Sequence, residues 1–521
     1  MKREQCLAGV LALLLTGCSA SEPAPSPAAE SHSPVCTDWS ALTPYETPKE
    51  HYTRRYAEFT DTVIPADDYG PLIPFHGATL GRSQNGWTDS FPLWGLVTLE
   101  GEVVVDPVFS SAFAPIGYQS NGQAAGLSDV LILTKTVEVP GGEPRALSAL
   151  CARDGHWCTE FLYSYDWEFF FDLDLSKGIP LWKGDTQMVF LDPADGHELR
   201  AADARPYLEM GMEYPWQLLS NLRVEERYAP FEITAEDGTP RFGIADLDAG
   251  THILLDSDIL YLSPFSQGLC QAQTVSGSGY LDGNGQWVID PIYGQAGDFF
   301  SGAASVRNWE GHFLFLSPDG SVLLQAPEWC TEVDLFPGSF PLWRCQGDSQ
   351  SLYLDADLTP IELPKDTQRS QVLNDGWIAC MRSDGGWTLF RQGETCLFSS
   401  ELGQPQTVQD GYALLQVPDG GAWSLVCLKT GDSVSLPHST FADFQRDAIT
   451  GQSYIQTGSE ELQQWTLFRL DGETISTCPY GASDRDSLEG GLILREREDF
   501  STLLTQESET VFCWSIPTPW D

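Results

Sequence analysis

The feature that most constrains this chain is a hairpin pattern that recurs along it. Residues 95–109 and 279–293 share one order of features: a short apolar strand, a turn glycine, a second apolar strand, and an Asp-Pro pair before an aromatic residue. Glycine tolerates the positive φ that such turns require, and proline lacks the N–H that would continue an interior ladder. Each segment therefore predicts one β-hairpin. The matching residues are Gly101 and Gly285 at the turns and Phe109 and Tyr293 at the ends.

Weaker copies of the hairpin extend the pattern over most of the chain. The turns at Gly250, Gly285 and Gly320 lie 35 residues apart, and the later turns are separated by 35 to 41 residues. Further turns of this kind occur at Gly155, Gly196, Leu358, Gly393, Gly431 and Gly472. Periods of this size are typical of arrays in which neighbouring units bury each other's faces. Helical periodicity is scarce, and only residues 201–222 are spaced to allow a helix. We predict an all-β, tandem β-hairpin repeat array, either propeller-like or solenoid-like.

Two of these segments resemble the bacterial WG repeat. Trp94-Gly95 opens the first segment, whereas the second, residues 279–306, has Ser278 in place of the tryptophan. The resemblance is good over residues 94–118 and 242–325 and faint elsewhere. Membership of the WG-repeat family would imply a tandem β-array of a kind often found in envelope proteins. It would imply no catalytic residues.

The N-terminus predicts export and lipid attachment. Lys2 and Arg3 precede an apolar run over residues 6–15, which is too short to span a bilayer. The tetrad Leu15-Thr16-Gly17-Cys18 resembles the lipobox of bacterial lipoproteins. In that family the cysteine is diacylated and becomes the new N-terminus. The resemblance therefore implies lipidation at Cys18 and a lipid anchor in the cell membrane, with the protein on the extracytoplasmic side.

The chain is expected to divide into four parts. A stretch rich in proline and serine follows Cys18 and lacks apolar periodicity, which is typical of a tether. The expected parts are a lipoprotein signal peptide at residues 1–17, a lipidated tether at 18–40, an N-terminal β-repeat region at 41–230 and a WG-like β-repeat region at 231–521.

Net charge limits the partners. The chain has 74 acidic and 28 basic residues, for a formal net charge of −46. Nucleic-acid affinity comes largely from Lys and Arg that neutralise phosphates, so this composition excludes nucleic acid. The same charge repels anionic lipid headgroups and leaves the acyl chains as the membrane contact. An envelope protein or a glycan remains as a partner.

One pair among the cysteines is placed to form a disulfide. A two-residue Asp-Gly loop at 154–155 would pair Cys151 with Cys158 across a hairpin. By that count the two are a hydrogen-bonded pair, whose Cα atoms are about 5.5 Å apart, so the pattern permits a disulfide without requiring one.

The sequence offers no specific catalytic, metal or cofactor motif. The carboxylates are too numerous for any one pair to be informative. Asp192, Asp195 and Asp282 lie near turn glycines and could supply oxygen ligands to Ca²⁺. However, Asp-Gly and Asn-Gly are also preferred in hairpin turns, and we favour that interpretation. We expect no enzyme activity, no cofactor and no metal.

The aromatic residues are compatible with the hypothesis that the protein binds a glycan. Asp166, Asp172 and Asp174 lie near four aromatic residues and could line a sugar site, although the local alternation favours a half-buried strand. Four tryptophans are expected in the repeat core: Trp94, Trp387, Trp423 and Trp465. Three others fall outside the hairpin pattern and are better candidates for exposure: Trp87, Trp309 and Trp329.

The function that best fits these features is that of a cell-envelope lipoprotein. Its WG-like repeats would act as an extracytoplasmic scaffold for protein interaction or binding. The alternative is a carbohydrate-binding surface lipoprotein. A hydrolase with a site assembled between repeats is the least favoured hypothesis.

Overall fold

The computed structural model contains two units, Met1–Thr37 and Asp38–Asp521. The residues described here all belong to the second unit: 44–48, 64–65, 67–84, 87–118, 124–126, 129–137, 145–165, 174–213, 218, 223–338, 340–391, 393–417, 422–436, 439–479, 485–496 and 500–515. The expected signal peptide, the tether and Cys18 lie outside these residues. Both expected repeat regions contribute to the second unit, and β13 (Tyr228–Thr234) runs across residue 230.

Antiparallel sheets, built mostly from strands that are consecutive in the chain, make up the second unit. The first sheet contains β1 (Ile73–Gln84), β2 (Trp87–Val97) and β3 (Val103–Phe109). A seven-stranded sheet has the order β12 (Glu198–Asp203), β11 (Gln187–Leu191), β10 (Ile179–Lys183), β9 (Tyr163–Ser164), β8 (Arg145–Ala152), β7 (Val130–Val137) and β4 (Ser111–Phe113). Two smaller sheets are β5 (Ile116–Tyr118) with β6 (Ala124–Gly126), and β13 with β14 (Pro240–Asp246) and β15 (Thr251–Leu254).

Seven four-stranded sheets follow, each in chain order. The first three are β16 (Ile259–Leu262), β17 (Cys270–Thr274), β18 (Gly277–Leu281) and β19 (Trp287–Tyr293); β20 (Gln295–Ala296), β21 (Ala304–Arg307), β22 (Phe313–Leu316) and β23 (Val322–Gln325); and β24 (Glu332–Phe336), β25 (Leu342–Gln346), β26 (Ser351–Asp355) and β27 (Pro360–Ile361). The next two are β28 (Thr367–Val372), β29 (Ile378–Arg382), β30 (Trp387–Arg391) and β31 (Glu394–Phe398); and β32 (Gln404–Gln409), β33 (Tyr412–Gln416), β34 (Trp423–Cys427) and β35 (Ser433–Leu436). The last two are β36 (Phe441–Arg446), β37 (Ser453–Ser459), β38 (Gln464–Phe468) and β39 (Thr474–Pro479); and β40 (Arg485–Glu489), β41 (Leu492–Glu496), β42 (Phe500–Leu504) and β43 (Thr510–Ser515).

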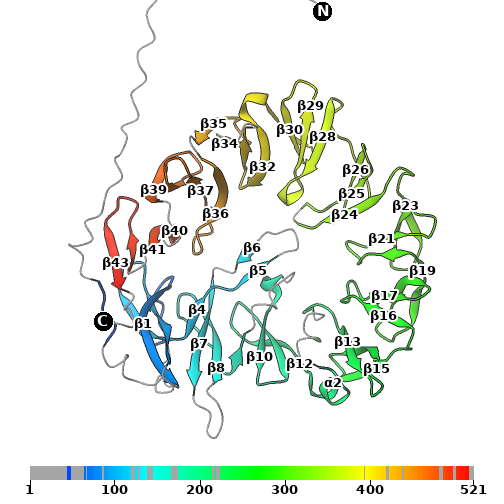
Figure 1. The fold of residues 1–521 in the computed structure, drawn as a ribbon, viewed down its shortest axis with the longest axis horizontal. Helices are drawn as coiled ribbons and strands as arrows, with labels where there is room; N and C mark the ends of the chain where they lie inside the picture. The colour runs from blue at the N-terminus through cyan, green and yellow to red at the C-terminus, as the bar shows by residue number, and fades with distance from the viewer. Residues whose placement is uncertain are drawn as a thin grey trace, which may run out of the picture. The chain divides into compact units, whose positions relative to one another are not determined.

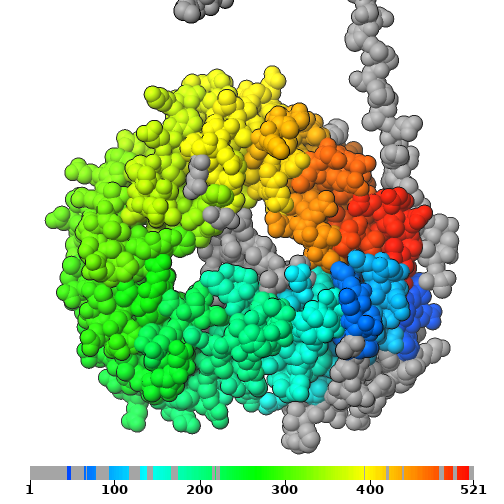
Figure 2. Space-filling view, turned by 180° about the vertical axis from the view of Figure 1, so that it is seen from behind, coloured from blue at the N-terminus to red at the C-terminus, as the bar shows by residue number. Residues whose placement is uncertain are grey.

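The sheets follow one another around a ring, which closes where the last sheet meets the first (Figure 1). Phe75 of β1 packs against Phe512 and Trp514 of β43, with ring centroids 5.1 and 5.7 Å apart. The N–H of Tyr45 also donates to the carbonyl of Cys513, at 2.6 Å. In Figure 2 the last sheet, in red, lies against the first, in blue. This all-β array is therefore propeller-like rather than solenoid-like.

Apolar side chains fill the junction between each pair of neighbouring sheets. The closing junction is of the same kind as the others, because Val97 of the first sheet and Leu503 of the last are fully buried in one cluster. A further cluster joins β7 and β8 to β10 and β11 within the seven-stranded sheet, which thus contains two successive units. Each sheet is stabilised mainly by burial against its neighbours.

The recurring turns adopt the left-handed backbone that the sequence predicts. At Gly285 the N–H donates to the carbonyl of Asp282 at 3.0 Å, and Asp282 N–H donates to Gln286 at 2.9 Å, as in a type I turn followed by a left-handed residue. In all ten turns that the sequence predicts, the named turn residue has a positive φ. Ser508, which the sequence does not predict as a turn residue, also has a positive φ. These residues are Gly101, Gly155, Gly196, Gly250, Gly285, Gly320, Leu358, Gly393, Gly431, Gly472 and Ser508.

Several turn glycines also rest on the last strand of the preceding sheet. A Cβ atom at Gly285 would lie 2.8 Å from the side chain of Ile253 on β15. One at Gly320 would lie 3.3 Å from Ile289 on β19. These separations are shorter than ordinary van der Waals contact, so at Gly285 the glycine permits close packing as well as the turn.

The same contact recurs where the ring closes. A Cβ atom at Gly101 of the first sheet would lie 2.6 Å from the carbonyl oxygen of Val511 on β43. The equivalent distance from Gly472 to the side chain of Val434 on β35 is 2.4 Å. The last and first sheets therefore meet through the same turn-on-strand packing as sheets that are consecutive in the chain.

A buried arginine adds polar bonds at the closure. Arg153, at the turn after β8, donates from Nε to the carbonyl of Leu72 at 3.1 Å and from Nη1 to that of Ala448 at 3.0 Å. Its Nη2 lies 3.4 Å from the Glu489 carboxylate at the end of β40. Arg153 thus joins segments that are far apart in the sequence.

Asp447 completes this polar group. Its carboxylate accepts the N–H groups of Gly490 at 2.9 Å and Gly491 at 2.6 Å, in the turn after Glu489. Burial raises the pKa of Glu489 to about 7, and the charge of Arg153 opposes that rise. Asp447 thus links the last two sheets, while Arg153 lies at the closing junction between Leu72 and Glu489.

The hairpin at Cys151 and Cys158 differs from the predicted one in the length of its loop. The predicted two-residue loop at 154–155 is wrong, because Ala152 N–H donates to the carbonyl of Trp157 at 2.8 Å and the loop has four residues. Cys151 and Cys158 are therefore a non-hydrogen-bonded pair with Cα atoms 4.0 Å apart, and they form a disulfide.

The segment expected to allow a helix over residues 201–222 contains a shorter one. β12 extends to Asp203, and α2 (Arg205–Glu209) begins there with proline in its first turn. Residues 214–217 and 219–222 lie outside the described part of the chain.

Substitution of Gly285 tests the turn-on-strand contact. We expect Gly285→Val to lower the free energy of unfolding more than Gly431→Val does. Both positions have positive φ, which costs about 1 kcal/mol for a side chain, but only at Gly285 would the new atoms also overlap Ile253 and Leu255. Urea unfolding of the two variants measures the difference. Equal losses at the two sites would show that the contact with the preceding strand contributes nothing.

Candidate functional site

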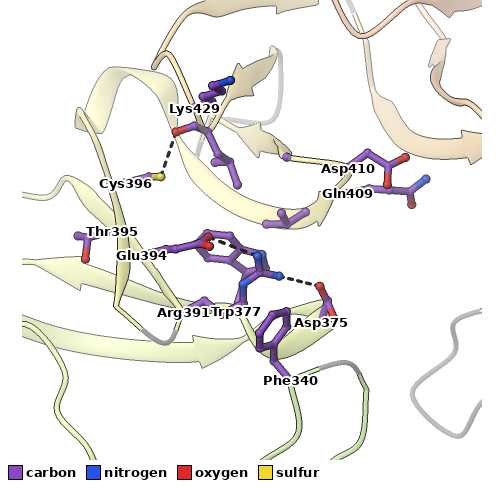
Figure 3. A pocket seen from close by; sticks show the side chains of 13 residues that line it. Phe340, Asp375, Trp377, Arg391, Glu394, Thr395, Cys396, Gln409, Asp410 and Lys429 are labelled. Atoms are coloured by element: carbon purple, nitrogen blue, oxygen red, sulfur yellow. Dashed lines mark hydrogen bonds and ion pairs between the residues drawn. The ribbon is translucent and has the colours of Figure 1, made fainter.

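A pocket of about 700 Å³ lies between the sheet β28–β31 and the sheet β32–β35 (Figure 3). Its walls come from the short helix η5 (Asn374–Gly376), the start of β31, the end of β32 and the turn after β34. Phe340, from the loop before β25, covers one side. We call this the Arg391 pocket.

Arg391 is the central residue of the pocket. Its guanidinium lies between two aromatic rings, 4.2 Å from the centroid of Phe340 and 4.4 Å from that of Trp377. Nη1 is 2.7 Å from Asp375 and Nη2 is 3.3 Å from Glu394. With only 16% of its side chain exposed, Arg391 is held in one orientation, and its charge is balanced by two carboxylates.

Two aspartates occupy equivalent loops at the pocket. Asp375 follows β28 and Asp410 follows β32, and both have positive φ, of 54° and 48°. Asp410 accepts hydrogen bonds from Arg446 at 3.1 Å and from the hydroxyl of Ser453. Both carboxylates are thus fixed in position, which suits recognition of a polar group that enters the pocket.

Cys396 is a structural thiol in this pocket. Its Sγ donates to the carbonyl of Leu428 at 3.3 Å, and burial raises the pKa of the thiol. A protonated thiol is a poor nucleophile, so this cysteine contributes packing rather than covalent chemistry.

The Arg391 pocket is not predicted from the sequence. The sequence predicts only that Trp387 lies in the repeat core and that Gly393 lies at a turn, and Phe340 and Trp377 come from other loops. The one sequence signal for this site is that basic residues are rare, since the chain has 28 basic and 74 acidic residues, so each arginine is a candidate for a specific role.

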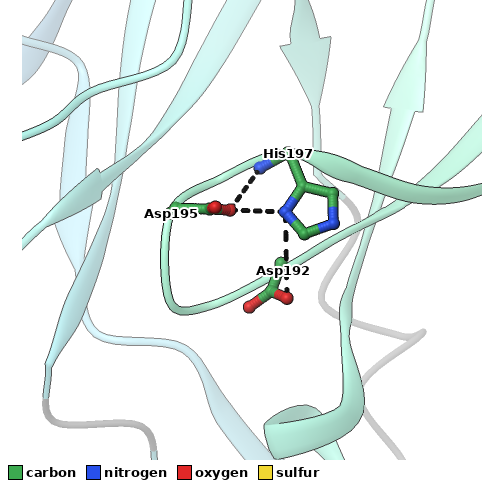
Figure 4. A group of neighbouring side chains, drawn as sticks. All are labelled: Asp192, Asp195 and His197. Atoms are coloured by element: carbon green, nitrogen blue, oxygen red, sulfur yellow. Dashed lines mark hydrogen bonds and ion pairs between the residues drawn. The ribbon is translucent and has the colours of Figure 1, made fainter.

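The turn at Asp192 and Asp195, for which the sequence favours a hairpin turn over a Ca²⁺ site, is held by hydrogen bonds. Nδ1 of His197 lies 2.5 Å from Asp195 and 3.8 Å from Asp192 (Figure 4). The same carboxylates accept backbone N–H groups, Asp192 from Ala194 at 2.7 Å and Asp195 from His197 at 3.0 Å. The hydrogen bond to Asp195 raises the pKa of His197. These bonds agree with the turn interpretation, and Asp282 likewise accepts from the backbone of Asn284.

The aromatic residues divide between core and surface. Phe109, Tyr293, Trp387 and Trp423 are buried, and Trp94 and Trp465 are half-buried. Trp309, in the loop before β22, is 69% exposed. Trp329 instead packs between β20–β23 and β24–β27.

Three sequence-predicted features lie outside the described residues or side chains. Cys18 is one, and the side chain of Trp87 is another. Residues 166–173 of the aspartate cluster are the third, while Asp174 caps the short helix η4 (Leu175–Lys177) by accepting from Ser176 N–H.

Among the described residues, no helix is both long and apolar enough to span a bilayer.

Comparison with solved structures gives remote likenesses. Hsv2 of Kluyveromyces lactis is 9% identical, with a TM-score of 0.26 over 48% of this chain and 95% of that one. A eukaryotic initiation factor is 11% identical, with a TM-score of 0.35 over 74% and 93%. AztD of Citrobacter koseri is 13% identical, with a TM-score of 0.22 over 64% and 92%. Likeness at this level carries no information about function.

A family match covers the last two strands of one sheet and the first two of the next. No curated relative matches the chain. The family described as the WG containing repeat matches residues 279–308, which run from β18 to the end of β21. The segment that resembles the WG repeat by its turn glycine and Asp-Pro pair is thus matched independently, and the chain carries WG-type repeat sequence within its ring of hairpin units.

Proposed function

We propose that this chain is a cell-envelope lipoprotein whose ring of WG-like units is an extracytoplasmic scaffold that binds a partner protein. The observation that carries the proposal is the ring itself. It joins hairpin units through apolar junctions and presents loops and edge strands outward, which suits recognition of extended or protein ligands. A WG-type repeat lies in the array.

The Arg391 pocket supports binding. Its volume of about 700 Å³ fits a side chain or a short segment of a partner. Arg391, Asp375 and Asp410 are each held by neighbouring side chains, so they could engage a partner without reorganising. No cofactor or metal takes part in this proposal.

The anchor is proposed from the sequence alone. Lipidation of Cys18 would attach the second unit to the cell membrane through the Pro- and Ser-rich tether. The acidic composition supports attachment by lipid rather than by contact with anionic headgroups.

Trp309 supports a second candidate, carbohydrate binding. An indole that is 69% exposed can stack on the face of a sugar ring. In the Arg391 pocket, by contrast, the guanidinium already lies over the faces of Phe340 and Trp377.

Substitution of Cys18 tests the anchor. We expect the full-length protein to sediment with membranes and Cys18→Ala to appear in the soluble fraction, because the thioether-linked lipid can no longer form. Ser19→Ala is the matched control and should sediment like the wild type. Fractionation followed by immunoblotting measures both variants. Sedimentation of Cys18→Ala with membranes would contradict the anchor.

Capture of partners tests the scaffold. Residues 36–521 serve as bait against solubilised envelope proteins and a panel of cell-wall and dietary glycans. We expect a saturable protein partner that binds again after purification. Saturable glycan binding that Trp309→Ala abolishes would instead favour the carbohydrate candidate, and no binding in either arm would contradict both.

A further inference from the structure

The last strands of three consecutive sheets carry exposed apolar side chains. β15, β19 and β23 lie along the outer rim of the ring (Figure 1). Each is the last strand of its sheet, with one partner strand among the described residues. The exposed apolar side chains on them are Ile253 and Leu254, Val288 and Ile292, and Val322 and Leu323. We call this surface the apolar rim.

β23 carries two exposed apolar side chains at its edge. Val322 and Leu323 are 56% and 51% exposed. The strand reads Val-Leu-Leu-Gln, so it contains neither proline nor a charged residue, which are two of the devices that block pairing at a sheet edge, and its pairing with β22 shifts register between Val322 and Leu324. β19, by comparison, contains Asp290 and Pro291. The side chains of β23 therefore do not oppose the approach of another strand.

The charge around the apolar rim is strongly negative. Residues 251–328 contain eight acidic residues and one basic residue, Arg307. Four exposed carboxylates lie on or beside the three strands: Asp256, Asp258, Asp290 and Asp319. A second copy of this chain would be repelled, because its own formal net charge is −46.

We infer that the apolar rim binds an extended, cationic segment of a partner protein, which pairs with β23. The apolar side chains of the segment contact Val322 and Leu323, and its Lys or Arg residues lie near Asp319 and Asp290. Backbone pairing with an edge strand supplies affinity, and the alternation of apolar and basic residues supplies specificity. This inference rests on the proposed scaffold function and gives it a surface and a partner chemistry.

Three labelled octapeptides test this inference on residues 36–521: alternating Lys-Val, alternating Glu-Val and alternating Lys-Gly. Fluorescence anisotropy should show saturable binding of the Lys-Val peptide alone. Leu323→Lys should weaken that binding about tenfold, because it removes an apolar contact and adds a like charge. Leu397→Lys is the matched control, since Leu397 is 69% exposed on the last strand of another sheet, and it should leave the affinity within about twofold.

Other outcomes overturn the inference. Equal binding of the Lys-Gly peptide would mean that charge alone drives the contact, and equal loss in Leu323→Lys and Leu397→Lys would place the site elsewhere. No binding of the Lys-Val peptide would exclude a cationic strand. If the wild type and Leu323→Lys capture a partner protein equally well, the apolar rim is not the binding site, but the scaffold function is still supported. Failure to capture any partner would instead count against the function itself.

Discussion

Burial of apolar side chains between neighbouring sheets is the interaction on which this ring depends, and at several junctions a hairpin turn also packs closely on the preceding unit. The turn at Gly285 comes so near Ile253 that a Cβ atom would overlap it, and Gly101 approaches Val511 in the same way. The first contact joins consecutive sheets, and the second joins the last sheet to the first. Because one geometry serves both, the array closes without a special closing element. The buried Arg153 adds polar bonds at that junction, to the carbonyl of Leu72 beside the first sheet and to Glu489 of the last.

The packing of the sheets also determines which surfaces are available to bind a partner. Each sheet buries its faces against two neighbours, so the exposed elements are loops at the two ends of the sheets and the last strands at the rim. The Arg391 pocket lies among the loops, and the apolar rim consists of last strands. The Arg391 pocket holds polar groups around an arginine whose charge is balanced by carboxylates. The apolar rim presents apolar strand edges beside exposed carboxylates. Two surfaces of such different chemistry are what a scaffold for proteins needs.

The units could be predicted from the sequence because their signals are local. A turn glycine, the strands on either side and the Asp-Pro pair lie within about fifteen residues. Ring closure could not be predicted, since it depends on contacts such as that of Tyr45 with Cys513, for which no sequence pattern exists. The Arg391 pocket was missed for the same reason, as Phe340, Trp377 and Arg391 meet only through the packing of separate loops and strands. Ser508 was missed because it is not a glycine, although its backbone is left-handed.

The distance between the first and last turns tests ring closure most directly. Spin labels attached without cysteine chemistry at Glu100 and Glu509, both exposed, report it by pulsed electron resonance. Sheets pack about 10 Å apart, so a closed ring predicts a separation below about 30 Å including the label arms, whereas an open array of the same units would separate these turns by about 100 Å. A short, narrow distance distribution is the result that this structure predicts. A separation near the longer value would contradict the closed ring and, with it, the packing of Gly101 on Val511.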